Sequence, residues 1–264
     1  MITSRLRSWC QEFGVDGVYV SFSGGKDSTV LLDIARQYDM EIKGMFCDTG
    51  LEYPEIRSFV KTKKNVEWIK PEINFREVIL KYGYPIISKE VAKHIYGCRT
   101  SVKKKQNYLN RFDGLNDDFT PSKYRKYFMK WKPLLNMPFK ISNRCCWFIK
   151  EKPSRQYEQQ TGRKLILGTM AEESQQRKQG WFKTGCNSYK GTVVSKPMSF
   201  WTEQDVLRYI KENSLQYCSI YGDIIPVEDD KILANHKLNT TECQRTGCMF
   251  CGFGLHLEKG ETRF

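Results

Sequence analysis

A short strand-forming run that meets a glycine pair and then a helical pattern is the feature that most restricts the fold of this chain. Alternating valines and a phenylalanine end at Gly24-Gly25, and apolar residues then recur at helical spacing over residues 30–38. Glycines allow close backbone approach and left-handed angles, and the helix directs its N–H groups and positive dipole end at the turn. The pattern therefore predicts a strand-turn-helix unit that holds an anion.

The turn itself has the sequence Ser23-Gly24-Gly25-Lys26-Asp27-Ser28. It lacks the spacing of the Walker motif, and it resembles the PP-loop of ATP pyrophosphatases, whose signature is Ser-Gly-Gly-x-Asp-Ser. In that superfamily the loop grips the β- and γ-phosphates, and a substrate is adenylylated at the α-phosphorus with loss of pyrophosphate. The resemblance implies that all six residues bind ATP with Mg²⁺, and that Lys26, Asp27 and Ser28 are catalytic. We expect Lys26 and Asp27 to lie on an exposed loop. An ordinary glycine-rich turn is the alternative.

Strands and helices alternate after this turn. We expect strands at residues 42–47 and 66–69, with helices at residues 52–63 and 75–82. Such alternation predicts a Rossmann-like parallel sheet with helices on both faces, and ligands bind such sheets beyond the carboxyl ends of the strands.

Asp48-Thr49-Gly50 follows the second predicted strand. It resembles the second motif of the phosphoadenosine phosphosulfate (PAPS) reductase and sulfate adenylyltransferase families, which lies near the nucleotide. The resemblance implies that these three residues line the nucleotide site and that Asp48 binds magnesium or orients a phosphate. A helix-capping role for Asp48 is the alternative.

A later predicted strand, Leu165–Leu167, leads into Gly168-Thr169 and then Glu173-Ser174, with Arg177 beyond. This resembles the fourth-strand motif of the same superfamily. It implies that Gly168, Thr169, Glu173 and Arg177 bind the nucleotide. Farther along, Thr202 is predicted to cap a helix with Asp205 at its third position.

Cysteines are the second informative pattern. Cys145 and Cys146 are adjacent, which disfavours a disulfide between them, while Cys248 and Cys251 have a spacing that lets two thiolates reach one metal. The two pairs resemble the [4Fe–4S] module of adenylyl-sulfate (APS) reductases, which implies that these four residues bind such a cluster. Zinc is the alternative, because four thiolates suit both metals.

Other cysteines have weaker signals. Cys186 and Cys243 are spare candidates, either as replacement ligands or as a nucleophile that carries sulfur, and we place Cys186 among the catalytic residues. We predict that the remaining cysteines, Cys10, Cys47, Cys98 and Cys218, are buried small hydrophobes.

Residues 99–132 are strongly basic, with ten lysines and arginines against three aspartates, and aromatic residues are interleaved with them. The whole chain carries a formal charge of +13. Cations with aromatics suit a surface that grips a phosphate backbone and stacks unpaired bases. We therefore expect a nucleic-acid partner, DNA or tRNA. A solvated insertion whose aromatics pack inward is the alternative.

Location and domains follow from the same reading. With no long apolar run and no apolar signal core, we expect a cytoplasmic protein with no membrane contact, and in that reducing compartment the ten cysteines favour metal binding or catalysis over disulfides. We predict a PP-loop nucleotide-binding domain of the adenine nucleotide alpha hydrolase-like class over residues 1–215, with a basic insertion at about 99–132. A C-terminal cysteine-containing module over residues 216–264 packs on it.

The resemblances leave three functions open. Sulfonucleotide reductases carry a catalytic cysteine in a C-terminal Glu-Cys-Gly-Leu/Ile-His motif, and their loops usually lack the Lys-Asp pair. Here Gly254-Leu255-His256 follows soon after Cys251, and Lys26-Asp27 is present. We therefore favour an ATP-dependent iron–sulfur sulfurtransferase that modifies nucleic acid, with a sulfur donor such as a cysteine desulfurase. A PAPS or APS reductase, and a non-catalytic nucleotide-binding subunit of a modification or defence complex, are the alternatives.

Overall fold

The computed structural model describes residues 1–227 and 237–257. Contacts divide the chain into two compact units. The first comprises Met1–Asp48, Glu52–Lys70 and Ser154–Gly247, and the second comprises Thr49–Leu51, Pro71–Pro153 and the chain from Cys248 onward. These units do not coincide with the predicted domains 1–215 and 216–264, whose boundary stays a prediction.

The first unit contains a six-stranded sheet with the order β3-β2-β1-β5-β7-β6. All neighbouring strands run parallel except β6, which is antiparallel to β7. The predicted parallel sheet is therefore confirmed. Its strands are β1 (Val18–Ser21), β2 (Lys43–Cys47), β3 (Val66–Ile69), β5 (Lys164–Ile166), β6 (Asn187–Ser188) and β7 (Val194–Ser195).

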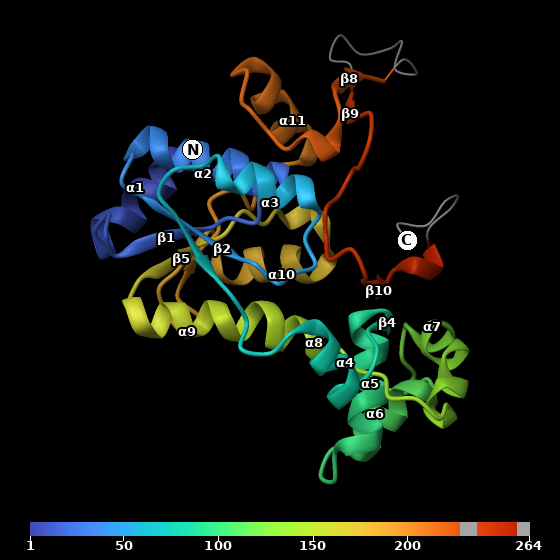
Figure 1. The fold of residues 1–264 in the computed structure, drawn as a ribbon. Helices are drawn as coiled ribbons and strands as arrows, with labels where there is room; N and C mark the ends of the chain where they lie inside the picture. The colour runs from blue at the N-terminus through green and yellow to red at the C-terminus, as the bar shows by residue number, and fades with distance from the viewer. Residues whose placement is uncertain (228–236, 258–264) are drawn as a thin grey trace. The chain divides into compact units, whose positions relative to one another are not determined.

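Helices cover both faces of this sheet because successive side chains of a strand point to opposite faces. Val18 and Val20 of β1 belong to the largest apolar cluster, which includes Leu6 and Trp9 of α1. Tyr19 points the other way and packs with Tyr157 of α9. Figure 1 shows α1, α2 and α3 on one side of β1 and α9 on the other. The helices of this unit are α1 (Ile2–Phe13), α2 (Lys26–Tyr38), α3 (Pro54–Lys61), α9 (Lys152–Thr161), α10 (Gln175–Thr184) and α11 (Glu203–Glu212).

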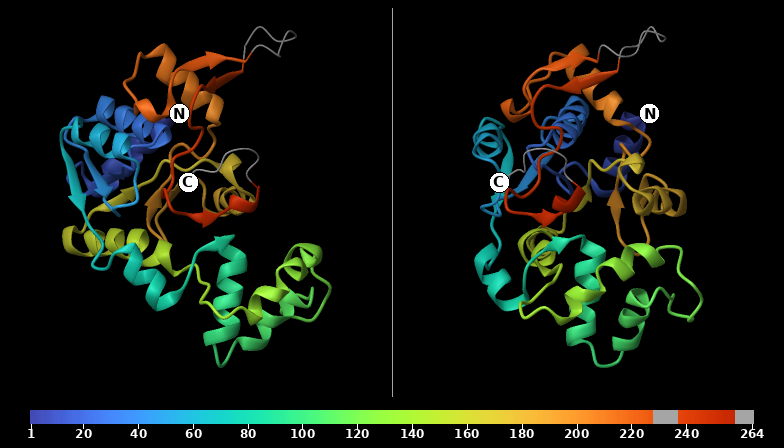
Figure 2. Two further views of the ribbon diagram at one scale, coloured as in Figure 1. Left: turned by 45° about the vertical axis from the view of Figure 1, so that its right-hand side comes forward. Right: turned by 90° about the vertical axis from the view of Figure 1, so that its right-hand side faces the viewer.

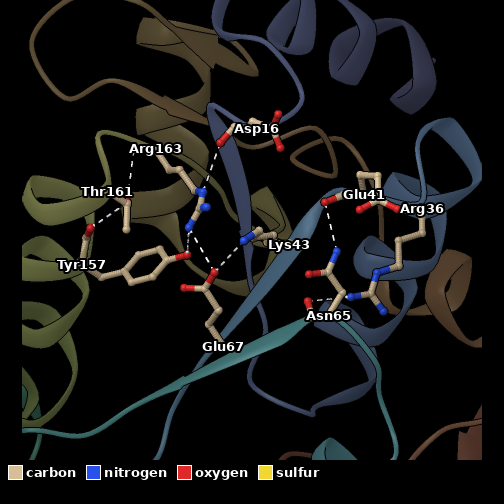
Figure 3. A network of polar contacts seen from close by, with 9 residues as sticks. All are labelled: Asp16, Arg36, Glu41, Lys43, Asn65, Glu67, Tyr157, Thr161 and Arg163. Atoms are coloured by element: carbon tan, nitrogen blue, oxygen red, sulfur yellow. Dashed lines mark hydrogen bonds and ion pairs between the residues drawn. The ribbon is translucent and has the colours of Figure 1, made fainter.

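A polar network ties the amino ends of the strands together (Figure 3). Arg163, just before β5, donates to the Glu67 carboxylate at 3.2 Å and to the Tyr157 hydroxyl at 2.8 Å. Lys43 of β2 reaches the same carboxylate at 3.1 Å. Burial by itself would raise the pKa of Glu67, but hydrogen bonds from Lys43 and Tyr157 and the charges of Arg163 and Lys43 lower it overall. Because this network lies at the amino ends of the strands, it does not occupy the carboxyl ends, where the candidate site lies.

Several local predictions are confirmed. β3 has the predicted bounds, and Pro54 begins α3, where a missing N–H costs nothing. At α11 the Thr202 side chain accepts from the Asp205 backbone while the Asp205 carboxylate accepts from Thr202, as the capping prediction required. A small antiparallel pair, β8 (Ile224–Pro226) and β9 (Leu238–Thr240), follows this helix.

The second unit is mainly helical (Figure 2, teal to green). Its helices are α4 (Phe75–Tyr82), α5 (Lys89–Thr100), α6 (Lys105–Phe112), α7 (Arg125–Lys130) and the short α8 (Arg144–Cys146). Two short strands, β4 (Ile86–Ile87) and β10 (Gly252–Phe253), pair in parallel. None of the helices in the described parts of the chain has the length and apolar character that crossing a membrane requires.

Candidate nucleotide site and cysteine cluster

A pocket of about 310 Å³ lies in the first unit beyond the carboxyl ends of β1 and β5. These strands are neighbours, and the sheet continues to β2 on one side and to β7 on the other. The pocket therefore occupies the position where strand order reverses, which is where open α/β sheets bind ligands. The predicted residues that line it are Ser23, Gly25, Lys26, Asp27, Ser28, Gly168, Thr169, Glu173 and Arg177.

Hydrogen bonds within the loop hold its shape. The Ser28 hydroxyl lies 3.0 Å from the Ser23 hydroxyl and donates to the Gly25 carbonyl at 3.0 Å. Gly24 has a φ of 74°, and a Cβ there would lie 2.8 Å from a Val60 methyl and 2.9 Å from an Ile56 methyl. Only glycine fits both the angle and the space, so the first glycine of the motif is required by packing against α3.

Lys26 departs from the expectation of an exposed loop side chain. It is 4% exposed, because its stem is enclosed by the pocket wall and by the Tyr221 ring, whose centroid lies 5.2 Å from Nζ. Its ammonium pairs with Glu203 at 2.9 Å and donates to the Gln244 carbonyl at 2.6 Å. The lysine is thus a buried, oriented cation at the wall of the pocket.

Asp27 is half-buried beside this cation. Burial raises the pKa of its carboxyl, as does the charge of Glu203, while Lys26, Arg245 and Arg177 oppose the rise. Among the described residues, no side chain or backbone group bonds to its buried Oδ1 atom. A buried carboxylate oxygen without a partner is costly, and a hard cation is a suitable ligand for it.

The sequence analysis missed several further residues that line the pocket, among them four from the C-terminal part of the first unit. Tyr221 accepts from the Lys26 backbone N–H at 3.3 Å, and its hydroxyl lies 2.8 Å from that of Thr246. Glu203 is the partner of Lys26, and Arg245 adds a cation to the wall. The sequence did contain a hint of Glu203, because it is the first residue of α11, directly after the predicted cap. Tyr221 has no such signal, because the loop that it contacts lies 195 residues away in the sequence.

Arg177 forms an ion pair with Glu173, one helical turn earlier. Both residues follow β5, and Ser174 caps the start of α10 by accepting from the Arg177 backbone. The predicted motif after the strand at residues 165–167 therefore supplies both a cation and its orienting carboxylate to the pocket.

The Asp48 motif has a different environment. Asp48 is buried and pairs with Arg57 of α3 at 2.9 Å. The alternative prediction, that Asp48 caps a helix, is wrong for α3. The N-cap residue of this helix is Tyr53, and no side-chain hydrogen bond caps it. Thr49 accepts from the Leu51 backbone at 3.3 Å, and Thr49 and Gly50 belong to the second unit. None of the three is among the residues that line the pocket, so their nucleotide role stays a prediction.

The four predicted metal ligands belong to the second unit and come together in part. Cys145 is a buried member of an apolar cluster with Leu51 and Val78, and Cys146 and Cys248 pack against it. The charge of a Cys251 thiolate adds to the rise of the Cys145 pKa. Within residues 1–227 and 237–257, however, no three ligand side chains are arranged to hold a metal ion. The four cysteines are therefore brought near one another, but their side chains are not arranged as a metal site.

The adjacent cysteines differ in acidity. The hydrogen bond between them, followed by burial, raises the pKa of Cys145. The same hydrogen bond lowers the pKa of Cys146 to about 6, with help from Lys89 and Lys150 against the effect of burial. Cys146 is therefore the more acidic of the two thiols.

The other cysteines are mostly buried. Cys10, Cys98 and Cys218 are buried as predicted, whereas Cys47 is half-buried. Cys186 is 6% exposed, lies just before β6 and is not among the residues lining the pocket. Cys243 is half-buried, and its thiol lies 2.9 Å from the Arg245 carbonyl. The sulfur-carrying role of Cys186 stays a prediction.

Comparison with known proteins decides the family. The family model described as the phosphoadenosine phosphosulfate reductase domain matches residues 17–252. The chain belongs to this family. The matched span runs from the start of β1 to the start of β10, so it includes both the pocket and the four cysteines.

The individual proteins that the chain resembles are distant in sequence. The chain is 24% identical over 224 residues to adenosine 5'-phosphosulfate reductase of Staphylococcus haemolyticus, covering 84% of this chain and 72% of that protein. PAPS reductase from Candida auris, solved with phosphate, shares 15% identity at a TM-score of 0.46, covering 83% of this chain and 82% of that one. NH3-dependent NAD synthetase from Campylobacter jejuni, solved with nitrate, shares 10% identity at a TM-score of 0.38, covering 81% and 71%.

Proposed function

We propose that this member of the PAPS reductase family is an ATP-dependent, adenylylating sulfurtransferase that introduces sulfur into nucleic acid. The observation that carries the ATP part is the Lys26-Asp27 pair in the pocket. A buried cation suits the charge of a polyphosphate, and the unpartnered Asp27 oxygen suits a divalent cation bound with it. Cleavage of a nucleoside triphosphate needs both the buried cation and the divalent cation, whereas reduction of a sulfonucleotide involves no phosphoryl transfer.

The charged and polar residues of the pocket have distinct roles in this proposal. Lys26 and the Ser23–Ser28 turn hold the pyrophosphate portion of ATP, and Arg177 and Arg245 neutralise the remaining phosphate charge. Asp27 is the residue that would hold Mg²⁺, which supplies positive charge to the departing pyrophosphate when it is bound. Ser28 orients the turn through its bond to Gly25.

The proposed reaction has two displacements. An oxygen of the acceptor attacks the α-phosphorus of ATP, the bond to the bridging oxygen breaks, and pyrophosphate leaves. A persulfide carried by a partner such as a cysteine desulfurase then attacks the adenylated position with its terminal sulfur and displaces AMP, and a cellular thiol reduces the resulting disulfide, so that sulfur replaces the acceptor oxygen. We retain Cys145, Cys146, Cys248 and Cys251 as the ligands of a proposed [4Fe–4S] cluster, with zinc as the alternative, and assign it no step because the described residues form no ready metal site.

A sulfonucleotide reductase is the second candidate. It is favoured by the family match and by the similarity to the Staphylococcus haemolyticus enzyme. The same pocket accommodates the phosphates of APS or PAPS, because Lys26, Arg177 and Arg245 recognise any phosphate.

A single assay separates the candidates. Protein purified anaerobically is incubated with ATP, Mg²⁺ and mixed cellular tRNA or DNA, and separately with APS or PAPS and thioredoxin. We expect pyrophosphate from the first mixture, AMP as well once sodium sulfide is added to it as the sulfur donor, and no sulfite from the second. Sulfite without pyrophosphate would establish the reductase instead, and ATP binding without either product would establish a nucleotide-binding subunit.

The basic segment, residues 99–132, supports the nucleic-acid part of the proposal. Some of its members are structural: Arg99 donates to four backbone carbonyls and Lys132 pairs with Asp113, while Phe112 and Phe128 are buried in a cluster beside α5. Other members are exposed cations and aromatics. These are Lys103, Lys104, Lys105, Phe119, Lys123, Tyr124, Arg125, Lys126, Tyr127 and Lys130. The segment therefore combines a packed core with a surface that suits a polyanion.

Replacing Lys103, Lys104 and Lys105 with glutamine should weaken nucleic-acid binding and reduce the salt slope of log K by about two to three units, if each contacts a phosphate. The matched control replaces Lys61, Lys64 and Lys70, which are equally exposed and change the net charge equally. Binding is measured by fluorescence anisotropy over a salt series. If the two triple variants have identical salt slopes, the basic segment is a solvated insertion that does not bind nucleic acid.

A further inference from the structure

Arg144, the first residue of α8, lies among aromatic rings of the second unit. Its guanidinium carbon is 5.5 Å from the centre of the Phe148 ring, 5.8 Å from that of Tyr96 and 5.9 Å from that of Tyr82. The Phe148 and Tyr82 rings themselves stack, with centroids 4.6 Å apart and planes 19° apart. Ring faces attract a cation and fix its position, but they supply no oxygen that accepts from its N–H groups.

The guanidinium of Arg144 lacks the acceptors that a charged donor normally has inside a protein. Its Nε atom is buried and has no hydrogen-bond partner among the described residues. Within residues 1–227 and 237–257, Arg144 also forms no ion pair with a carboxylate. A buried charged donor without an acceptor is costly, so packing alone does not account for an arginine at this position. An acceptor from outside the chain would account for it.

Arg144 borders a pocket of about 190 Å³ whose lining belongs entirely to the second unit. Lys89 and Asn143 also line it, so an ammonium and an amide join the guanidinium as hydrogen-bond donors. The space is smaller than the roughly 300 to 1,000 Å³ of pockets that hold drug-sized ligands, and it suits a group of a few heavy atoms. The other lining residues are Cys146, Trp147 and Glu151.

Two helix starts that are far apart in the sequence supply these donors. Lys89 is the first residue of α5, whose start is fixed because the Ser88 side chain accepts from the Val91 backbone. Asn143 is the N-cap residue of α8, and the chain continues from α8 through a π-helical turn at Trp147–Glu151. Such turns are rare and occur frequently at functional sites. The donors are therefore attached to helices, which hold a binding site more precisely than loops do.

We propose that this pocket is a binding site for a tetrahedral oxyanion of the phosphate or sulfate type. The planar guanidinium of Arg144 matches two oxygens of such an ion, Lys89 adds charge, and Asn143 donates to a further oxygen. Glu151 is the one acid that lines the pocket; it is exposed and pairs with neither cation, so the wall keeps a net positive charge. The nucleotide pocket shares no lining residue with this site, and the inference does not depend on the proposed function.

The oxyanion has two possible sources, a free ion or a phosphate group of a nucleic acid. Inorganic sulfate and inorganic phosphate, titrated by calorimetry in a chloride buffer of low ionic strength, are the probes for the free ion. Because the nucleotide pocket also attracts phosphate, these titrations use the full chain carrying Lys26→Met. A 5′-phosphorylated single-stranded oligonucleotide, titrated by fluorescence anisotropy, is the probe for the second source.

Arg144→Met keeps a side chain that packs between the rings and removes every donor of the guanidinium. It should weaken the sulfate and phosphate binding of the Lys26→Met chain about 10- to 100-fold, the equivalent of lost hydrogen bonds to a charged group. The matched control is Arg76→Met, which removes an exposed arginine of α4 in the same unit and should leave the affinity unchanged. Equal affinities of the two arginine variants would overturn the proposal, as would the absence of sulfate and phosphate binding in the Lys26→Met chain.

Glu151→Gln tests the same site with an exposed residue, so that the result does not depend on the packing of the aromatic rings. Removing this carboxylate should strengthen sulfate binding about 2- to 5-fold, because an exposed acid at the wall repels the ion. Asp117→Asn, at another exposed acid of the second unit, controls for the change in net charge. Unchanged or weaker sulfate binding by Glu151→Gln would contradict the site.

The oligonucleotide titration identifies the source of the oxyanion. If Arg144→Met weakens oligonucleotide binding relative to Arg76→Met, the site holds a phosphate of nucleic acid. If the two variants bind the oligonucleotide equally while sulfate distinguishes them, the site holds a free oxyanion. Both outcomes support the site, and neither depends on whether the protein cleaves ATP.

Discussion

Lys26→Met should reduce pyrophosphate release from ATP by about 10²- to 10³-fold, because it removes a preorganised cation at the transferring phosphates. Methionine is chosen because the lysine stem is buried and a truncation would open a cavity. Asp27→Asn should have an effect of similar size, since it removes the charge proposed to hold Mg²⁺ while keeping the shape of the side chain. Turnover is measured by coupled pyrophosphate detection under anaerobic conditions.

The matched control for these variants is Thr29→Val. Thr29 lies in the first turn of the same helix and donates to the Gly25 carbonyl at 2.9 Å, but it does not line the pocket. It should lose about 1 kcal/mol of stability and keep its turnover. Pyrophosphate release at the unmodified rate by both Lys26→Met and Asp27→Asn would contradict the phosphate-binding role of the loop.

Cys145→Ser and Cys248→Ser should each abolish retention of iron by anaerobically purified protein, if the four cysteines hold the proposed cluster. These side chains pack in one apolar cluster of the second unit, so loss of the metal should also lower the melting temperature. Iron and acid-labile sulfide are measured together with zinc. Stoichiometric zinc without sulfide in the unmodified protein would replace the cluster with the alternative metal.

Cys98→Ser is the control for the packing effect of a buried serine. Cys98 is 6% exposed in the same unit, close to the 5% of Cys145, but it belongs to the separate cluster beside α5. It should lower the melting temperature and leave the iron content unchanged. Retention of iron by both Cys145→Ser and Cys248→Ser would refute this ligand set.

Local patterns of the sequence were sufficient for the elements around the pocket. Strand residues before Gly24 and helical spacing after Lys26 predicted β1 and α2, because both patterns reflect burial of one face of a single element. Alternation of such elements predicted the parallel sheet and hence the position of the loop at its carboxyl end. The residues after β5 were placed in the same way, and Glu173 and Arg177 do line the pocket.

Only the tertiary structure decided how those residues are used. Lys26 was expected on an exposed loop, yet it is buried, because Glu203, Tyr221 and the Gln244 carbonyl come from the distant C-terminal part of the first unit to enclose it. Such contacts have no local periodicity, so no window of sequence records them. The same reason applies to α10, where only the fold leaves the Phe182 side chain exposed instead of buried in a core.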